Sequence, residues 1–263
     1  MSPGTLSPLS NVKALAFDVF GTVVDWRSSV VEELVVRAFR KLSTNLPEHL
    51  RSRLATISEE DWEKFAQQWR DTYSSFCKNF NPEVDAWRTV DEHHHDSLVN
   101  LLNEWGLEGL YTPTEVKSLS LVWHRLSPWP DSPDGLQQLS ARMVTTTLSN
   151  GNLALLRDLR DYSSLRFRRL LSAEMFGAYK PSQAVYGGAV SELGLEPHEV
   201  AMVAAHLKDL KAARGCGLRT IYVERKQEEE WSPDDDNYKE AREWVDLWIS
   251  EGEDGFVELA RRI

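Results

Sequence analysis

The stretch Val12–Asp25, VKALAFDVFGTVVD, decides the fold class of this chain. Its first part, Val12–Phe17, is apolar except for one lysine, which predicts a strand buried on both faces, as in a parallel sheet. The strand ends at Asp18, and the chain then turns through Gly21 and Thr22. Open α/β sheets bind ligands at the carboxyl ends of their strands, so Asp18 is a candidate site residue. An Asx turn, in which Asp18 caps its own loop, is the structural alternative.

The order of the later elements places this strand in a larger α/β unit. Amphipathic patterns predict helices at 29–42, 61–76, 85–105 and 115–126. Strands are then predicted at 143–148, 169–172, 200–204, 218–223 and 247–250, with helices at 135–141, 153–159, 182–193, 209–214 and 255–263. One strand, then helices alone, then alternating strands and helices predict a doubly wound, Rossmann-like core with a parallel sheet. We expect this core at residues 1–26 and 127–263, interrupted by a helical cap at 27–126 that lies over Asp18.

Size, charge and cysteine content narrow the class of protein. The chain has 263 residues, a net charge of −11, and two cysteines without metal-ligand spacing. The negative charge argues against nucleic acid and anionic membranes as partners, and no apolar run is long enough for a membrane span. Residues 1–11 lack the features of a secretory signal and are expected to form a disordered leader. We therefore expect a soluble cytoplasmic protein with reduced thiols.

Polar residues follow three later strands, just as Asp18 follows the first. Ser149 and Asn150 end one strand, Lys180 follows the next by a short loop, and Asp209 follows the third. Because parallel strands end at the same edge of a sheet, these side chains are expected to converge on Asp18. Their order resembles the haloacid dehalogenase superfamily, whose motifs are a nucleophilic Asp, a Ser or Thr, a Lys and a late acidic residue. The resemblance covers nearly the whole chain.

The residue two positions after Asp18 distinguishes branches of this superfamily. Phosphatases have a second Asp there, which protonates the leaving alkoxide, whereas this chain has Phe20. Loss of such an acid costs about 10²–10⁴-fold in ester cleavage, but a halide leaving group needs no proton. Asp18, Phe20, Gly21 and Thr22 resemble the Asp-x-aromatic-Gly-Thr motif of the L-2-haloacid dehalogenases. This resemblance implies catalysis without a metal or other cofactor, with Lys180 supplying the positive charge.

Further matches to the L-2-haloacid dehalogenases imply roles for single residues. Arg70, in a Trp-Arg pair of the cap, would approach the departing halide; a solvated charge on a helix is the alternative. Asp18, kept ionised by Lys180, would attack C2 of a short 2-haloacid with inversion, and water would hydrolyse the resulting ester. The residues implied in substrate binding are Phe20, Thr22, Ser149, Asn150 and Tyr186. A homodimer is also implied.

The late motif departs from the family pattern. Many relatives have Ser-x-Asn ahead of the late acid, where this chain has Ala204 and His206 before Asp209. An imidazole titrates near neutral pH, so His206 is a candidate base for the hydrolytic water. Glu32 of the cap is a candidate partner for His206. A capping box formed by Ser29 and Glu32 is the structural alternative for that glutamate.

Three functions stay open on the sequence. They are a 2-haloacid dehalogenase, a magnesium-dependent phosphatase of the same fold, and a non-catalytic ligand-binding relative. Phe20 favours the first, and the altered late motif is the support for the third. Two polar segments, 227–240 and His93–His95, are expected to be a solvated loop and a solvated helix face.

Overall fold

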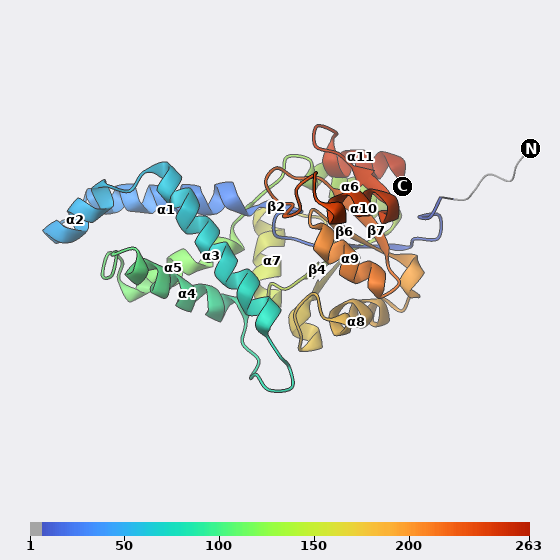
Figure 1. Cartoon of the computed structure of the whole chain (residues 1–263), viewed down its shortest axis with the longest axis horizontal. Coiled ribbons are helices and arrows are strands. Elements are labelled where there is room, and N and C mark those ends of the chain that lie inside the picture. Colours follow the sequence, from blue (N-terminus) through green and yellow to red (C-terminus); the bar gives the residue numbers. More distant parts are fainter. Residues whose placement is uncertain (1–6) are drawn as a thin grey trace, which may run out of the picture.

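The computed structural model describes residues 7–263 and contains a six-stranded parallel sheet (Figure 1). The strand order is β5-β4-β1-β6-β7-β8. The strands are β1 (Ala14–Phe17), β4 (Val144–Ser149), β5 (Arg169–Ser172), β6 (Val200–Ala204), β7 (Arg219–Val223) and β8 (Leu247–Ile249). The central strand β1 pairs with β4 and β6, so that Phe17 lies opposite Thr147 and Val203. The carboxyl ends of three central strands therefore meet beside Asp18.

Helices cover the sheet, which confirms the prediction of a doubly wound α/β core. They are α6 (Ser132–Arg142), α7 (Leu153–Tyr162), α8 (Gln183–Leu193), α9 (Leu207–Gly215), α10 (Asp236–Trp244) and α11 (Gly255–Arg262). In Figure 1, α6 and α11 pack together above the sheet and α8 lies below it. Phe17 is fully buried between them and contacts the rings of Phe167 and Phe256 edge to face. The core thus fixes β1, and with it the position of Asp18.

A helical segment interrupts the core between β1 and β4, and we call residues 26–126 the helical insert. Two short strands, β2 (Val24–Asp25) and β3 (Ser127–Pro128), pair antiparallel where the chain leaves and re-enters the core. The insert contains α1 (Trp26–Leu42), α2 (Glu48–Ala55), α3 (Glu59–Asn79), α4 (Val90–Glu104), α5 (Pro113–Ser120) and the 3₁₀ helix η1 (Leu121–His124). Figure 1 shows it beside the sheet, with α3 leading back toward the strand ends.

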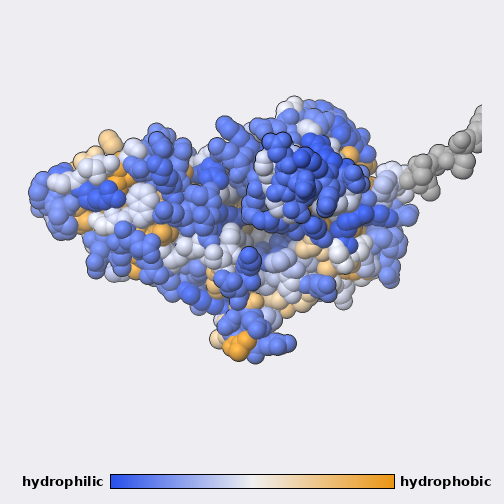
Figure 2. Space-filling model, in the orientation of Figure 1, coloured by the Kyte–Doolittle hydropathy of each residue, from blue (hydrophilic) through white to orange (hydrophobic). Residues whose placement is uncertain are grey.

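Local sequence determines where the insert helices begin. Ser58 and Thr89 form capping boxes with Asp61 and Glu92, which start α3 and α4. The apolar face of α3 is buried, whereas the surface shown in Figure 2 is mainly hydrophilic over both insert and core. None of the described helices is both long enough and apolar enough to cross a membrane.

Several boundaries predicted from the sequence are wrong. The first insert helix begins at Trp26 because the Asp25 side chain caps it, so the Ser29 capping box does not exist. The sequence predicts no helix between 42 and 61, but α2 forms there with Pro47 as its N-cap residue. The acidic stretch 227–240 includes the start of α10.

Two polar segments are more buried than the sequence suggests. His94 is buried and stacks on the Trp123 ring at 4.3 Å, because α4 packs this side against α3 and η1. It therefore does not belong to a solvated face. Of the predicted leader, residues 1–6 lie outside the described residues, and Leu9 is buried against the core.

Candidate active site

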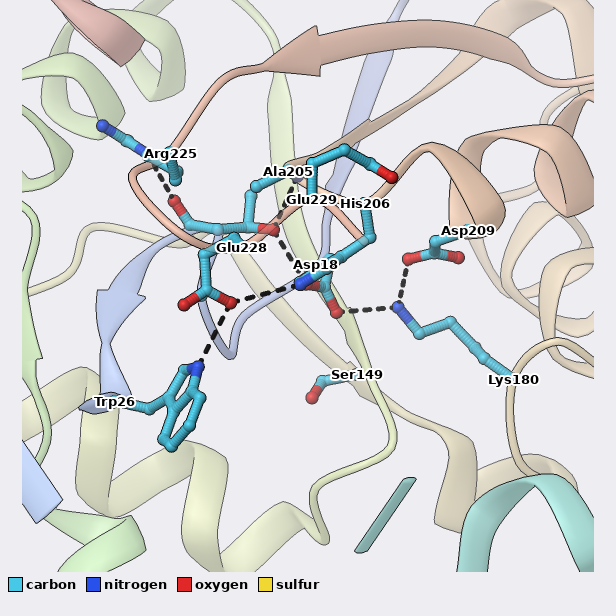
Figure 3. A network of polar contacts seen from close by, with 12 residues as sticks. Asp18, Trp26, Ser149, Lys180, Ala205, His206, Asp209, Arg225, Glu228 and Glu229 are labelled. Atoms are coloured by element: carbon cyan, nitrogen blue, oxygen red, sulfur yellow. Dashed lines mark hydrogen bonds and ion pairs between the residues drawn. The ribbon is translucent and has the colours of Figure 1, made fainter. Parts of the chain in front are cut away.

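Asp18 lies at the end of β1 with its carboxylate facing into a polar cluster (Figure 3). Its backbone N–H donates to the carbonyl of Val203 at 3.0 Å, which continues the pairing with β6. The Thr22 hydroxyl donates to Asp18 Oδ2 at 2.8 Å and accepts from the Ala205 N–H at 2.9 Å. Only 8% of Asp18 is exposed. The loop after β1 therefore holds a buried carboxylate in one orientation.

Lys180 bridges two buried carboxylates. Its Nζ lies 2.9 Å from Asp18 Oδ1 and 2.6 Å from Asp209 Oδ2. The Tyr186 hydroxyl donates to the other oxygen of Asp209 at 2.6 Å. Burial alone would lower the pKa of Lys180, but the two carboxylates raise it above its ordinary value. Lys180 is therefore a permanent cation against Asp18.

His206 lies on the other side of Asp18, between two carboxylates. Its Nδ1 is 3.2 Å from Asp18 Oδ2, and its Nε2 is 3.3 Å from Glu228 Oε2. Since both ring nitrogens face carboxylate oxygens, both bear a proton and the ring is an imidazolium. Burial would lower the pKa of His206, but these carboxylates raise it to about 10. Burial would raise the pKa of Asp18, but Lys180 and His206 hold it well below its usual range.

Glu228, in the loop after β7, is a site residue that the sequence analysis missed. It is buried, and the Trp26 indole N–H donates to its Oε2 at 3.1 Å. A Cβ on Gly21 would come within 1.9 Å of this oxygen, and Gly21 has φ +83°, so only glycine fits there. The partner of His206 is therefore Glu228. Glu32, the predicted partner, lies exposed in the interior of α1.

Arg225 anchors the segment that holds Glu228. It donates to the Thr22 carbonyl at 3.1 Å and makes a bidentate pair with Asp131 at 2.6 and 2.8 Å. The rule that site residues follow parallel strands applies to this loop as well, because it directly follows β7. That rule marks the stretch 224–229 as a site loop, but it does not single out Glu228 among the charged residues there.

Asn150 and Ser149 lie after β4, as predicted. The Asn150 side chain binds the backbone of Lys180, accepting from its N–H at 2.7 Å and donating to its carbonyl at 3.4 Å. The buried Ser149 hydroxyl accepts from the Gly151 N–H at 3.2 Å. Asn150 thus positions the lysine loop while it lines the cavity described next.

A cavity of about 870 Å³ opens between the strand ends and the helical insert. Its lining includes Asp18, Arg70, Asn150, Lys180, Tyr186, His206, Asp209 and Glu228. Phe20 is buried behind it, edge to face with Tyr73 and Trp123. The predicted catalytic residues, Asn150 and Tyr186 line this cavity, whereas the predicted substrate-binding residues Phe20, Thr22 and Ser149 are buried and do not line it.

Arg70 projects from α3 over aromatic rings of this wall. Its guanidinium carbon lies 4.5 Å from the Tyr73 ring centroid, 5.5 Å from that of Phe20 and 5.6 Å from that of Trp26. Its Nη1 is buried and has no hydrogen-bond partner among residues 7–263. Arg70 also lines the cavity, where its positive charge favours an anion.

The donors around Asp18 do not fit a magnesium ion. Both carboxylate oxygens already face Lys180, His206 or the Thr22 hydroxyl, and Phe20 offers no oxygen ligand. Within residues 7–263, no cluster of three or more His, Cys, Asp or Glu side chains is arranged to hold a metal.

Comparisons with known proteins agree with this geometry. The model of the haloacid dehalogenase-like hydrolase family matches residues 12–217. The (S)-2-haloacid dehalogenase 4A of Burkholderia cepacia is 27% identical over 223 residues, which cover 82% of this chain and 85% of the relative. The crystal structure of a defluorinating L-2-haloacid dehalogenase matches with a TM-score of 0.79 at 30% identity, covering 95% of this chain and 94% of the other. For another L-2-haloacid dehalogenase the TM-score is 0.77 at 34% identity, covering 95% and 98%.

Proposed function

The chain belongs to the haloacid dehalogenase-like hydrolases, and from this premise we propose that it converts short L-2-haloacids into 2-hydroxy acids. Its similarity to named (S)- and L-2-haloacid dehalogenases over most of its length supports this substrate class. The observation that carries the proposal is the setting of Asp18. It is an ionised carboxylate between Lys180 and His206, and Phe20 stands where a phosphatase has its proton donor.

In the first step, an oxygen of Asp18 attacks C2 of the substrate from the side opposite the halogen. The new O–C2 bond forms as the carbon–halogen bond breaks, which inverts C2 and leaves an ester on Asp18. The depressed pKa of Asp18 keeps it nucleophilic at neutral pH. Arg70 lines the cavity and stabilises the negative charge that develops on the halide.

In the second step, water attacks the Asp18 carbonyl carbon and releases the hydroxy acid. Lys180 faces Asp18 Oδ1 and the Thr22 hydroxyl faces Oδ2, so whichever oxygen becomes the oxyanion of the tetrahedral intermediate has a donor beside it. His206 Nδ1, 3.2 Å from Asp18 Oδ2, is the group placed to accept the proton of the attacking water. Asp209, held by Tyr186, keeps Lys180 in position.

The helical insert acts as a cap in this proposal. It supplies Arg70 and Trp26, so it must lie against the core for the cavity to be complete. Closing the cavity during the first step keeps water away from the bound haloacid and strengthens the charge interactions among the residues that line the cavity. A homodimer and a cytoplasmic location stay predictions.

The test measures halide release from chloro-, bromo- and fluoroacetate and from both enantiomers of 2-chloropropionate. We expect release from the L enantiomer with inversion, and single turnover in ¹⁸O-water should place the label in Asp18. Hydrolysis of p-nitrophenyl phosphate that depends on Mg²⁺, with no halide release from any haloacid, would refute the proposal in favour of a phosphatase.

A further inference from the structure

His206 presents a difficulty for the second step, and Glu228 resolves it. An imidazolium with both N–H groups directed at carboxylates has no free lone pair, so it cannot accept a proton from water. In the resting enzyme this is the state of His206, whose pKa is raised to about 10 by Asp18 and Glu228. The base of the second step must therefore be produced during the first.

We infer that esterification of Asp18 turns His206 from a cation fixed between two carboxylates into the base for ester hydrolysis, with Glu228 as its positioning residue. This inference rests on the proposed function and extends it. An ester is neutral, so Asp18 no longer stabilises the proton on Nδ1 once the O–C2 bond has formed. Glu228 still accepts from Nε2 at 3.3 Å, which leaves Nδ1 free and directed at the ester.

The protons balance over the cycle. After the halide leaves with the electron pair of its bond, His206 releases its Nδ1 proton to solvent. Nδ1 then takes a proton from the attacking water and gives it to the departing alkoxide of the hydroxy acid. The Asp18 carboxylic acid formed from the ester gives its own proton to His206, which restores the imidazolium and the resting carboxylate. The net reaction releases one halide and one proton for each water consumed.

Three contacts fix the position of Glu228 beside His206. Trp26 of the insert donates to it at 3.1 Å, the Arg225 carbonyl accepts its N–H at 3.3 Å, and the glycine at position 21 leaves room for its carboxylate. It thus holds His206 as an aspartate holds the histidine of a Ser-His-Asp triad, fixing the tautomer and stabilising the imidazolium.

Two further carboxylates near His206, those of Glu229 and Glu230, belong to the same loop as Glu228. Glu229 accepts from the Leu207 N–H at 2.7 Å, and its pKa is raised by burial. Glu230 pairs with Lys208 at the surface. Both contacts are independent of Asp18, so the charge at Asp18 is the one that changes next to the ring during the reaction.

The first test needs no substrate. The Asp18→Asn side chain is neutral, like the ester, and we expect the pKa of His206 to fall by about 2 units or more, measured by NMR titration of its ring protons. The ring-proton signals of exposed His49 serve as the internal reference of this experiment. An unchanged pKa of His206 in Asp18→Asn would overturn the inference, whatever the enzyme's substrate.

The second test compares Glu228→Gln with His206→Ala in rapid mixing with L-2-chloropropionate at about pH 8. Both variants should accumulate the ester, seen by intact mass, and release about one halide per site in a burst. Glu228→Gln keeps the imidazole, so its halide burst should be accompanied by a proton burst of equal size; His206→Ala should release halide without it. The matched control is Glu240→Gln, an exposed glutamate on α10 that should behave like the wild type.

The outcomes separate this inference from the proposed function. If no variant forms an ester on Asp18, the proposed function fails. If the ester forms but Glu228→Gln hydrolyses it at the wild-type rate, or releases no proton with the halide, the function stands and the role of Glu228 and His206 is refuted. A role of Glu228 in folding alone would slow hydrolysis equally at every pH. Loss of its charge should instead also move the rise in hydrolysis to lower pH, because the imidazolium loses a stabilising anion.

Discussion

Replacing Arg70 by methionine should remove activity and leave the free energy of unfolding nearly unchanged. The reason lies in the contacts of its guanidinium, which stacks on Tyr73, Phe20 and Trp26 and has a buried Nη1 without a hydrogen-bond partner among residues 7–263. An unpaired buried donor costs about 1–3 kcal/mol, and cation–π contacts return about 0.5–2 kcal/mol. The two effects nearly cancel, and methionine keeps the unbranched apolar stem. We therefore expect a change of about 1 kcal/mol or less in unfolding free energy.

The effect on catalysis should be far larger. Loss of one preorganised donor to a developing anion costs about 10²–10³-fold in rate. The rate constant of the halide burst should fall by this factor in Arg70→Met, because Arg70 acts in the first step. Urea denaturation followed by tryptophan fluorescence gives the stability, and rapid-mixing halide detection gives the rate.

Arg242→Met is the matched control. Arg242 also stacks on an aromatic ring, that of Trp248 at 3.6 Å, but it lies on α10 outside the cavity lining. It should lose a little stability and no activity. A burst rate within about threefold of the wild type in Arg70→Met would show that Arg70 is a packing residue. A loss of more than about 2 kcal/mol in unfolding free energy would show that its buried N–H groups are satisfied.

Three further predictions follow from the charged cluster. Asp18→Asn should fold, because the ion pairs Lys180–Asp209 and His206–Glu228 remain. It should release no halide, and halide release at the wild-type rate would exclude Asp18 as the nucleophile. Lys180→Met should lose about 3–5 kcal/mol of unfolding free energy at neutral pH, because two buried carboxylates lose their cation. Because the pKa of Asp18 is depressed in the folded state, the ionised carboxylate stabilises the fold at pH values above its unfolded pKa. The difference in unfolding free energy between wild type and Lys180→Met should therefore shrink below about pH 4, and the acid limb of activity in the variant should move to higher pH. Equal pH profiles for variant and wild type would contradict this prediction. Trp26→Phe, which removes the 3.1 Å hydrogen bond to Glu228, should slow ester hydrolysis more than halide release, and an equal effect on both steps in single-turnover experiments would oppose this.

The fold and every member of the charged cluster except Glu228 were predicted from the sequence. The strands β5 and β6 have the bounds predicted for them, because each is a short apolar run with clear ends. Once the sheet is parallel, the strand-end residues Asp18, Lys180 and Asp209 must lie close together, and the structure places Lys180 Nζ 2.9 Å from Asp18 Oδ1 and 2.6 Å from Asp209 Oδ2. The sequence pattern is sufficient here because parallel strands bring their carboxyl ends, and the residues that follow them, to one edge of the sheet.

Glu228 could not be obtained in the same way. Its neighbours form an acidic, polar segment, and such a composition is typical of solvated loops. Its burial depends on the missing side chain of Gly21 and on the indole N–H of Trp26, which are distant in sequence. Glu32 has neither of the two roles predicted for it, because Asp25 caps α1 in place of Ser29 and Glu32 lies exposed within that helix.

The charge state of His206 is the feature hardest to predict from the sequence, because it depends on the combined charges of the side chains around it. In the resting cluster, the carboxylates of Asp18, Asp209 and Glu228 face the cations Lys180 and His206, which leaves one net negative charge. Esterification removes one negative charge and would leave the cluster neutral. Loss of the His206 proton restores the original net charge, so the protein environment that suits the resting state also suits the state that attacks the ester. The same imidazole can therefore support an ionised nucleophile in one step and act as a base in the next, without any movement of the backbone.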